Sequence, residues 1–358
     1  MRVKLGDVCQ KGTSNIAQKD LEGHSGNYPI YGASGFITNV DFYQQENPYI
    51  AVVKDGAGIG RIMKLPAKSS VIGTMQYIIP NDTVDISYLA YAMEHMNLSK
   101  YFTGATIPHI YFKDYQKEEL PLPSLDEQRK IAAVLDKVSE LIAKRRQQLD
   151  KLDEMVRARF VEMFDLSACT YGMLSDNTEF VDYRGHTPTL SNDGNIRMVN
   201  AKSVGKGVFK YVEEYVTEKT YNSWMHRGFG YPGDVLFVTE GHTFGNACQV
   251  PQGLTKFALG QRVITIQGHR GIINNAFLCA YMQTDKFIKD IAMYKTGGTA
   301  QGIRSKDLGK VEVPLYPYGQ QEIFEKFVEQ TEKTKTAISE SLEKLETLKK
   351  ALMQEYFG

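Results

Sequence analysis

Few residue patterns in this sequence could perform chemistry. None of its seven histidines occurs in a spacing that binds a metal ion, such as HExxH, and neither a GxSxG motif nor a GxxxxGK[ST] phosphate loop is present. The four cysteines are scattered without a CxxC pair, which argues against a zinc site or a disulfide framework. We therefore expect no catalytic residues, no metal ion and no cofactor in this chain.

One segment, AVVKDGAGIG at residues 51–60, suggests at first sight the glycine-rich loop of a methyltransferase. A glycine loop that binds a nucleoside or a phosphate must open a helix, but Pro66 follows within six residues and the intervening RIMKL is strand-like. The preceding Pro48 and Tyr49 also lack the second proline of an NPPY motif. We therefore interpret this segment as a hairpin turn.

Glycine-containing loops that carry polar and aromatic side chains are the more informative feature. In the first half of the chain they cover residues 27–37, 54–61, 72–76 and 103–113, and in the second half residues 182–188, 239–246, 258–262 and 296–306. Glycine lets a backbone approach a phosphate closely, while Arg, Lys, Gln, Asn, Ser and Thr can pair with base edges. Any single loop could be an ordinary surface turn, but recurrence in both halves favours DNA binding.

We accordingly predict that side chains from both sets of loops contact DNA. In the first half the candidates are Tyr31, Ser34, Lys54, Arg61, Gln76, Thr106, His109 and Lys113. In the second half they are Tyr183, Arg184, Thr187, His242, Gln261, Arg262, Thr299, Gln301, Arg304 and Lys306. Trp224 is instead expected to pack in a core beneath the second set.

The composition is that of an ordinary folded protein, with 42 basic and 42 acidic residues and 42% hydrophobic residues over 358 positions. No stretch approaches the roughly 18 consecutive apolar residues of a membrane span, and the first residues lack the apolar run of a signal peptide, so we expect a cytoplasmic protein. Because no segment is a basic tail, DNA contacts must come from local patches or be shared with a more basic partner.

The strongest feature of the sequence is an internal duplication. Residues 101–165 align without a gap on residues 294–358, at an offset of 193, with 18 of the 65 positions identical. Upstream the likeness is fainter, although residues 50–60 and 236–245 are similar in type. The chain therefore reads as two copies of one unit, each a divergent globular part followed by a related tail.

Each tail is predicted to be a long helix. Apolar residues recur in steps of three and four through residues 125–165 and 320–357, without Gly or Pro, and helices of this length with a narrow apolar stripe need a partner. The globular parts mix short strands, at 48–80, 208–217, 234–239 and 260–267, with helices near 85–99 and 274–292. We therefore predict an α+β fold with globular domains at residues 1–124 and 166–318 and helices at 125–165 and 319–358.

With these features taken together, the chain resembles the specificity (S) subunit of a type I restriction-modification system over essentially its whole length. The segments that carry the resemblance are ELPLPSLDEQRKIAAVLDKVSELI and its counterpart VEVPLYPYGQQEIFEKFVEQ, together with YPIYGASG, DYRGHTP and GDVLFVTEG. The second copy has Tyr316-Pro317-Tyr318 where the first has Pro123-Ser124-Leu125, so it departs from the pattern where its helix should begin.

The resemblance implies two target recognition domains, each reading one half of a split, asymmetric double-stranded DNA sequence, held apart by helices that pack as an antiparallel coiled coil with pseudo-two-fold symmetry. It also implies partner subunits. Two modification (M) subunits would bring S-adenosylmethionine and adenine methylation, and restriction (R) subunits would bring ATP, Mg and DNA cleavage in defence against phage. A subunit that recognises DNA for these partners would itself be no enzyme.

An excess of apolar residues at the start of the first long helix suggests where a partner could dock. Residues such as Ile131, Val134, Val138 and Leu141 lie on more than one face, which is more than a two-helix seam would bury. We predict that they form a docking surface for the M subunit. The alternative is that they pack against the globular domains of this chain.

Two other classes of function stay open at this point. The chain could be a stand-alone DNA-modifying enzyme with an unrecognised site, in which case it would bind S-adenosylmethionine by itself. It could also be a scaffold that binds no nucleic acid, in which coiled coils tether two ligand-binding domains, and it would then fail to bind any DNA even with an M subunit present.

Overall fold

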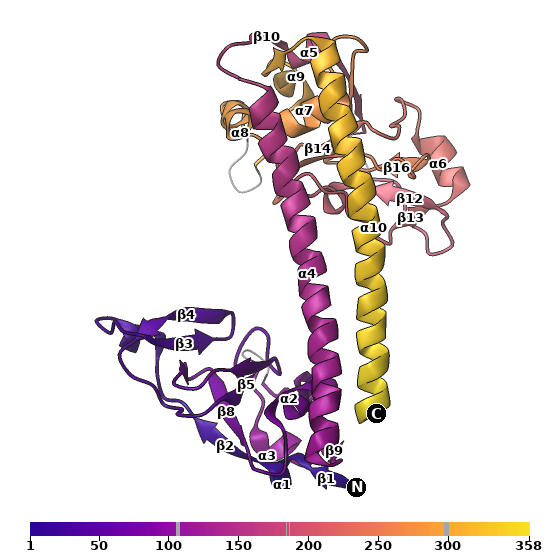
Figure 1. Ribbon diagram of the computed structural model, residues 1–358. Helices are drawn as coiled ribbons and strands as arrows, with labels where there is room; N and C mark the ends of the chain where they lie inside the picture. The colour runs from indigo at the N-terminus through magenta and orange to yellow at the C-terminus, as the bar shows by residue number, and fades with distance from the viewer. Residues whose placement is uncertain (105–107, 184, 186, 297–300) are drawn as a thin grey trace. The chain divides into compact units, whose positions relative to one another are not determined.

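The computed structural model describes residues 1–104, 108–183, 185, 187–296 and 301–358 (Figure 1). The chain forms two compact units, of which the first comprises residues 1–146 and 340–358 and the second residues 147–339. The two longest helices, α4 (Leu125–Met163) and α10 (Tyr318–Phe357), each contribute a segment to both units. Among the helices described, none combines the length and apolar character needed to cross a membrane.

The first unit is built on a four-stranded antiparallel sheet. Its strand order is β2 (Cys9–Thr13), β8 (Met75–Pro80), β5 (Tyr49–Val53) and β6 (Ile62–Leu65). All five residues of β5 are buried, as expected for a central strand with the apolar sequence YIAVV. Helix α2 (Ile86–His95) packs against β5 and β6 and begins at Asp85, whose carboxylate accepts the backbone N–H groups of Ser87 and Tyr88.

Smaller elements complete the first unit. A three-stranded sheet has the order β4 (Gly35–Val40), β3 (Tyr28–Gly32) and β7 (Ser70–Val71), and β1 (Arg2–Lys4) pairs with β9 (Glu119–Pro121). The short helices are α1 (Leu5–Val8) and α3 (Phe112–Tyr115), with 3-10 turns η1 (Gln18–Leu21) and η2 (Leu98–Tyr101).

The second unit repeats this plan around a larger insertion. Its main sheet has the order β11 (Thr178–Asp182), β17 (Val263–Gly268), β14 (Val235–Val238) and β15 (Ala247–Gln249). A second sheet consists of β13 (Tyr215–Val216), β12 (Ile196–Val199) and β16 (Phe257–Leu259), and β10 (Thr170–Met173) pairs with β18 (Glu312–Leu315). The remaining elements are α5 (Leu174–Asn177), η3 (Ala201–Ser203), α6 (Glu218–Trp224), α7 (Asn275–Tyr281), α8 (Asp285–Ala292) and α9 (Ser305–Leu308).

The two main sheets match strand for strand. In each main sheet the strand that comes first in the sequence lies at one edge, beside the strand that comes last, and the two strands between them in the sequence follow in order. The pair β5 and β6 therefore corresponds to β14 and β15, as the faint likeness between residues 50–60 and 236–245 predicts. The predicted α+β fold, with two copies of one unit and two long helices, is confirmed.

Local details differ from the sequence prediction in three places. The helix expected near 85–99 ends at His95, because Asn97 adopts a left-handed conformation (φ 50°) and a 3-10 turn follows. The helix expected at 274–292 is two helices, α7 and α8, and Thr284 caps the second. Of the strand expected at 208–217, only Tyr215–Val216 is formed.

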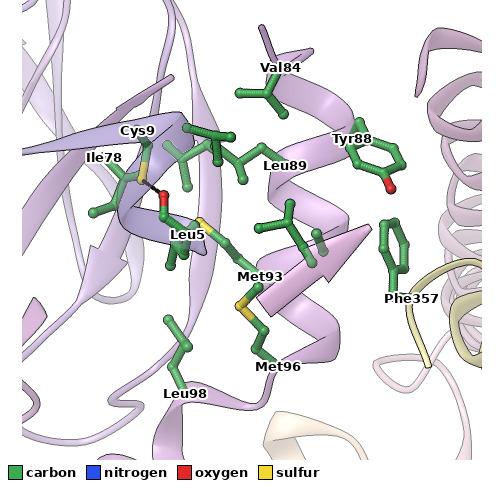
Figure 2. Close-up of a cluster of buried hydrophobic side chains, with 14 of the residues drawn as sticks. Leu5, Cys9, Ile78, Val84, Tyr88, Leu89, Met93, Met96, Leu98 and Phe357 are labelled. Atoms are coloured by element: carbon green, nitrogen blue, oxygen red, sulfur yellow. Dashed lines mark hydrogen bonds between the residues drawn. The ribbon is translucent and has the colours of Figure 1, made fainter. Parts of the chain in front are cut away.

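Each unit is closed by antiparallel segments of both long helices. In the first unit Leu135 of α4 and Phe357 of α10 share one core with α2, and Figure 2 shows Phe357 facing Tyr88 of α2. In the second unit Phe164 of α4 packs with Phe324 of α10 and Phe277 of α7. Phe164 and Phe357 are equivalent in the duplication, so the end of each long helix completes the core of the other copy's globular part.

Candidate nucleic-acid interface

In the first unit two glycine-containing loops are joined at their bases. The first, residues 54–61, connects β5 to β6, and the second begins at Thr103 and ends at His109, with residues 105–107 outside the described part of the chain. Thr103 and His109 close the second loop by exchanging backbone hydrogen bonds of 2.8 and 2.9 Å. Two more backbone bonds join the loops, from Gly56 N–H to Pro108 O (3.0 Å) and from Ile110 N–H to Lys54 O (3.0 Å). We call these two segments the first loop pair.

The second unit builds the same arrangement from residues 239–246 and from the ends of the segment 296–302, whose residues 297–300 are not described. We call these two segments the second loop pair. Thr296 and Gly302 exchange backbone bonds of 2.9 and 3.1 Å. The joining bonds run from Gly241 N–H to Gln301 O (3.0 Å) and from Ile303 N–H to Thr239 O (2.9 Å). At the offset of 193, Thr296 and Gly302 correspond to Thr103 and His109, so both units hold their loops in one backbone frame.

An acidic residue lies at the base of each loop pair and contacts a basic side chain. In the first unit Asp55 bonds to the imidazole Nδ1 of His109, and Lys54 Nζ lies 3.7 Å from its carboxylate. In the second unit Glu240 accepts a bond of 3.0 Å from Arg262 Nε. The Glu240–Arg262 pair is exposed, and an exposed ion pair adds little stability, so its main effect is to orient the guanidinium group, for which a DNA phosphate could compete. The Asp55 contacts are half-buried.

The turn between β3 and β4 extends the first loop pair. Arg61 donates a hydrogen bond of 2.7 Å to the carbonyl oxygen of Ala33, which ties the glycine loop to this turn. Ser34 is exposed in the turn, and the half-buried ring of Tyr31 contacts Phe36 edge to face with centroids 6.1 Å apart. The bond therefore holds Arg61 beside the turn that contains Ser34, next to the strand that carries Tyr31.

The described residues offer little to catalysis or metal binding. No cluster of three or more His, Cys, Asp or Glu side chains able to hold a metal ion occurs among them. Cys9 and Cys279 are buried, and burial raises the pKa of both thiols to about 12, so neither is a thiolate at neutral pH. The loop pairs are therefore the main candidate for a functional site among the described residues.

Comparison with known proteins decides the family. The family model described as the type I restriction modification DNA specificity domain matches residues 1–153 and 178–349. The chain belongs to this family. It is therefore a DNA sequence-recognition subunit of a type I restriction-modification system and carries no catalysis of its own, which answers both the enzyme and the scaffold alternatives.

Individual relatives agree with this assignment. The type I restriction enzyme MjaVIII specificity subunit of Methanocaldococcus jannaschii is 23% identical over 353 residues, covering 87% of this chain and 81% of its own length. A putative specificity subunit of Haemophilus influenzae, S.HindORF215P, is 20% identical over 347 residues, covering 89% and 83%. The fold matches the crystal structure of an S subunit from M. genitalium with a TM-score of 0.67 at 15% identity, covering 100% of this chain and 96% of that one.

Most predicted contact residues of this specificity subunit lie where DNA could reach them. Lys54 and His109 are half-buried at the base of the first loop pair, and Gln261 is half-buried beside Arg262. Lys113 is exposed, with its Nζ 5.2 Å from the ring centre of Tyr111. The other exposed candidates are Thr187, His242, Arg262, Gln301, Arg304 and Lys306. Thr106, Arg184 and Thr299 lie outside the described residues.

Two predicted contacts of the specificity subunit are contradicted by burial. Gln76 is only 3% exposed and its amide donates to the hydroxyl of Tyr115. Tyr183 is 1% exposed, and its hydroxyl donates to Gly228 O (2.8 Å) and accepts from the backbone N–H of Arg227 (2.7 Å). Both side chains satisfy their hydrogen bonds inside the protein, so neither is free to read a base. Trp224, expected in a core, is half-buried and donates to Leu259 O (2.7 Å).

The predicted M-docking surface is also partly wrong. Ile131 and Val138 are each 7% exposed, and Ile131 belongs to the core of the first unit. Ile131 therefore follows the alternative, in which α4 packs against its own domain, and Val138 is too buried to serve as a docking residue. Val134 is 42% exposed and Leu141 is half-buried, so only these two remain available on the surface of the specificity subunit.

Sequence reasoning missed one basic side chain and several aromatic ones beside the loops. Lys295 donates to Gln301 Oε1 (2.9 Å) and its Nζ lies 5.3 Å from the ring centre of Phe244, which places a cation on the second loop pair. Phe36, Phe102 and Tyr111 are 59%, 55% and 47% exposed around the first loop pair. Exposed aromatic rings beside glycine loops are the signal that could have identified them, because such rings can stack on bases or wedge between them.

Proposed function

We propose that this specificity subunit reads a bipartite, asymmetric DNA target, with one half of the target recognised by the loops of each unit. The observation that carries the proposal is the repeated backbone frame, in which equivalent hydrogen bonds hold loops with different side chains. His109 in the first unit corresponds to Gly302 in the second. The acidic residue at the base of the loops contacts Lys54 and His109 in the first unit but an arginine, Arg262, in the second. Different side chains on one frame would recognise different base sequences, so the two halves of the target should differ.

The proposed contacts are the candidates that burial leaves available. In the first unit they are Tyr31, Ser34, Lys54, Arg61, His109 and Lys113, and in the second Thr187, His242, Gln261, Arg262, Gln301, Arg304 and Lys306. We add Lys295, and we keep Thr106, Arg184 and Thr299 on their positions in the sequence. The cations would contact phosphates or guanine edges, and the polar side chains would contact base edges.

Partners follow from the neutral charge of the chain. With 42 basic and 42 acidic residues, it offers few cations to replace the counterions of a long DNA segment. We propose that two M subunits supply the rest of the DNA contact, bind S-adenosylmethionine and methylate adenine, and that R subunits, which use ATP and Mg, join through them in the cytoplasm. Val134 and Leu141 on α4 are the proposed docking residues for M. One solved chain from work on complex assembly of the type I R-M system shares the fold with a TM-score of 0.52 at 15% identity.

The test is an exchange of one globular part. Residues 1–124 would be replaced by the corresponding segment of another specificity subunit, the chimera co-expressed with its M subunit, and the methylated motif determined by methylome sequencing. We expect only one half of the motif to change. The donor segment should keep an aromatic residue at the position of Tyr88, so that the core with Phe357 stays intact. The reciprocal exchange of residues 166–318 should change only the other half, and a chimera that alters both halves would refute the two-reader proposal.

A further inference from the structure

Each unit contains one glutamine whose side chain is fully buried at the start of a long helix. Gln128 lies in the first turn of α4 and Gln321 in the first turn of α10, and both are 0% exposed. They occupy equivalent positions of the duplication and are identical, in a region where most neighbouring positions differ. A buried amide is costly unless its polar atoms are bonded, so the partners of these two side chains are informative.

Gln128 uses all of its polar groups to join three segments of the first unit. Its Oε1 accepts the backbone N–H of Asp85 at 2.8 Å. Its Nε2 donates to the carbonyl oxygens of Thr83 (3.2 Å) and Pro123 (2.9 Å). Asp85 is the residue that caps α2, and Pro123 lies in the connection that leads into α4. The amide therefore links the start of the long helix to the start of the domain helix.

Gln321 repeats the same three bonds in the second unit. Its Oε1 accepts the backbone N–H of Asn274 at 2.8 Å, and its Nε2 donates to Ile272 O (3.0 Å) and Tyr316 O (2.7 Å). Asn274 caps α7 as Asp85 caps α2. The bonding pattern has survived although Asp85 and Asn274 differ, and although Pro123 and Tyr316 belong to divergent connections.

These bonds add direction to an otherwise apolar contact. Packing of apolar side chains, such as Phe357 on Tyr88, is non-directional and tolerates small rotations and shifts. A buried amide that makes three hydrogen bonds opposes such movements, because rotation of the domain helix on the long helix would leave buried polar groups unpaired. The domain helices in turn pack on the strands that carry the loops, α2 on β5 and β6 and α7 on β14 and β15.

We infer that Gln128 and Gln321 are positioning residues, each of which fixes the orientation of one DNA-reading unit on the long helices and thereby the register of its loops on the target. This inference rests on the proposed function, because it assumes that each unit reads one half of the target. Neither glutamine touches DNA in this proposal. Each acts through its domain helix and the sheet beneath the loops.

The test uses Gln128→Met, which keeps the length and apolar bulk of the side chain and removes its amide. The whole specificity subunit would be assembled with its M subunit, and methylation rates measured on the wild-type target and on targets whose gap is one base pair longer or shorter. We expect the preference of the variant for the correct gap to fall at least about tenfold, since the lost bonds no longer oppose rotation of the unit. Gln321→Met should behave in the same way.

Matched controls separate positioning from folding. Gln320 is exposed and adjacent to Gln321, so Gln320→Met should leave the gap preference unchanged. Gln128→Glu keeps the shape of the side chain, and in its protonated form, which burial against two carbonyl oxygens favours, it still accepts the bond from Asp85 and donates one bond in place of two. We therefore expect an intermediate loss that provides a readout if Gln128→Met does not fold. A purely structural role would lower the melting temperature and the overall rate without changing the ratio of rates between gaps.

The outcomes distinguish this inference from the proposed function. If the wild-type complex reads two half-sites and Gln128→Met retains the full gap preference, the positioning role is refuted while the proposed function stands. If the wild-type complex shows no bipartite target, the proposed function itself fails. A variant that loses gap preference but keeps the base preference within each half-site would support both.

Discussion

Replacing Phe357 with alanine should destabilise the first unit, although this residue stands at the far end of the chain from that unit's sheet. Its side chain is 4% exposed, and its ring centre lies 5.1 Å from that of Tyr88 and 6.1 Å from that of His95. Figure 2 shows it beside Tyr88, at the edge of the cluster that α2 forms with Leu5, Cys9 and Ile78. The substitution therefore removes an aromatic side chain from the core that holds α2 in place.

The magnitude follows from the size of the lost side chain. Truncation of a buried phenylalanine to alanine costs about 3–5 kcal/mol, and we expect about 3 kcal/mol because the end of a helix can relax into part of the space. For a unit of this size, that free energy corresponds to a fall of about 6–12 °C in melting temperature. Amide exchange in α2 should accelerate about a hundredfold if opening of the unit limits it, since each 1.4 kcal/mol is a factor of ten.

Hydrogen exchange resolved by peptide is the appropriate assay, because it reports on each unit separately. Phe357→Ala should accelerate amide exchange in α2 and leave α7 protected. Phe164→Ala should do the reverse, since the ring centres of Phe164 and of Phe277 in α7 lie 4.7 Å apart. Leu348 is 46% exposed, so Leu348→Ala is a control that should change stability by less than about 0.5 kcal/mol. Equal deprotection of α2 and α7 by both phenylalanine variants would refute the reciprocal packing.

Three further predictions concern recognition, pH and docking. Arg262→Ala should cost about 1–3 kcal/mol and relax one target position if Arg262 reads a base, or weaken all sequences alike if it contacts a phosphate; unchanged affinity for target DNA would remove it from the interface. Burial raises the pKa of Glu118, but bonds from Lys100 and Tyr101 outweigh it and hold that pKa below the usual range. Its contribution to stability is therefore complete above the ordinary glutamate pKa and lost as the pH falls through the lower folded-state value, so Glu118→Gln should be less stable than the wild type in thermal melts at neutral pH, and the difference should shrink as the pH is lowered further below the ordinary glutamate pKa. Val134→Asp should reduce co-purification of the M subunit without lowering the melting temperature, and undiminished co-purification would exclude Val134 from the docking surface.

Periodicity and repetition allowed much of the fold to be predicted. The offset of 193 pairs residues that lie in equivalent elements, and uninterrupted apolar spacing identified α4 and α10 almost to their ends. These predictions succeed because local spacing alone determines whether a helix can form an apolar stripe. Such spacing does not reveal what covers the stripe. Ile131 and Val138 therefore looked like a docking surface, whereas both are buried, Ile131 in the core of the first unit.

The candidate site was predictable by loop but not by individual side chain. Glycine-rich loops at matching places identified both loop pairs, since glycine permits turns that few other residues allow. Gln76 and Tyr183 were misassigned because the groups that can bond a base can equally bond a buried partner, and only tertiary packing decides between the two. Gln128 and Gln321 show the converse, because an identical glutamine in two divergent copies gave no hint from its type alone that it is buried.

The loop pairs and the buried glutamines restrict the sequence to different degrees. The backbone bonds that close each loop pair involve N–H and C=O groups, which any residue other than proline can supply, so they place few restrictions on the side chains of the loops. The buried glutamines, by contrast, require one residue type, because only an amide of that length both donates and accepts across the gap. Under the proposed function, substitutions in the loops would therefore give new target sequences without any change in how the units are held. Substitutions at Gln128 or Gln321 would instead disturb the placement of a whole unit at once.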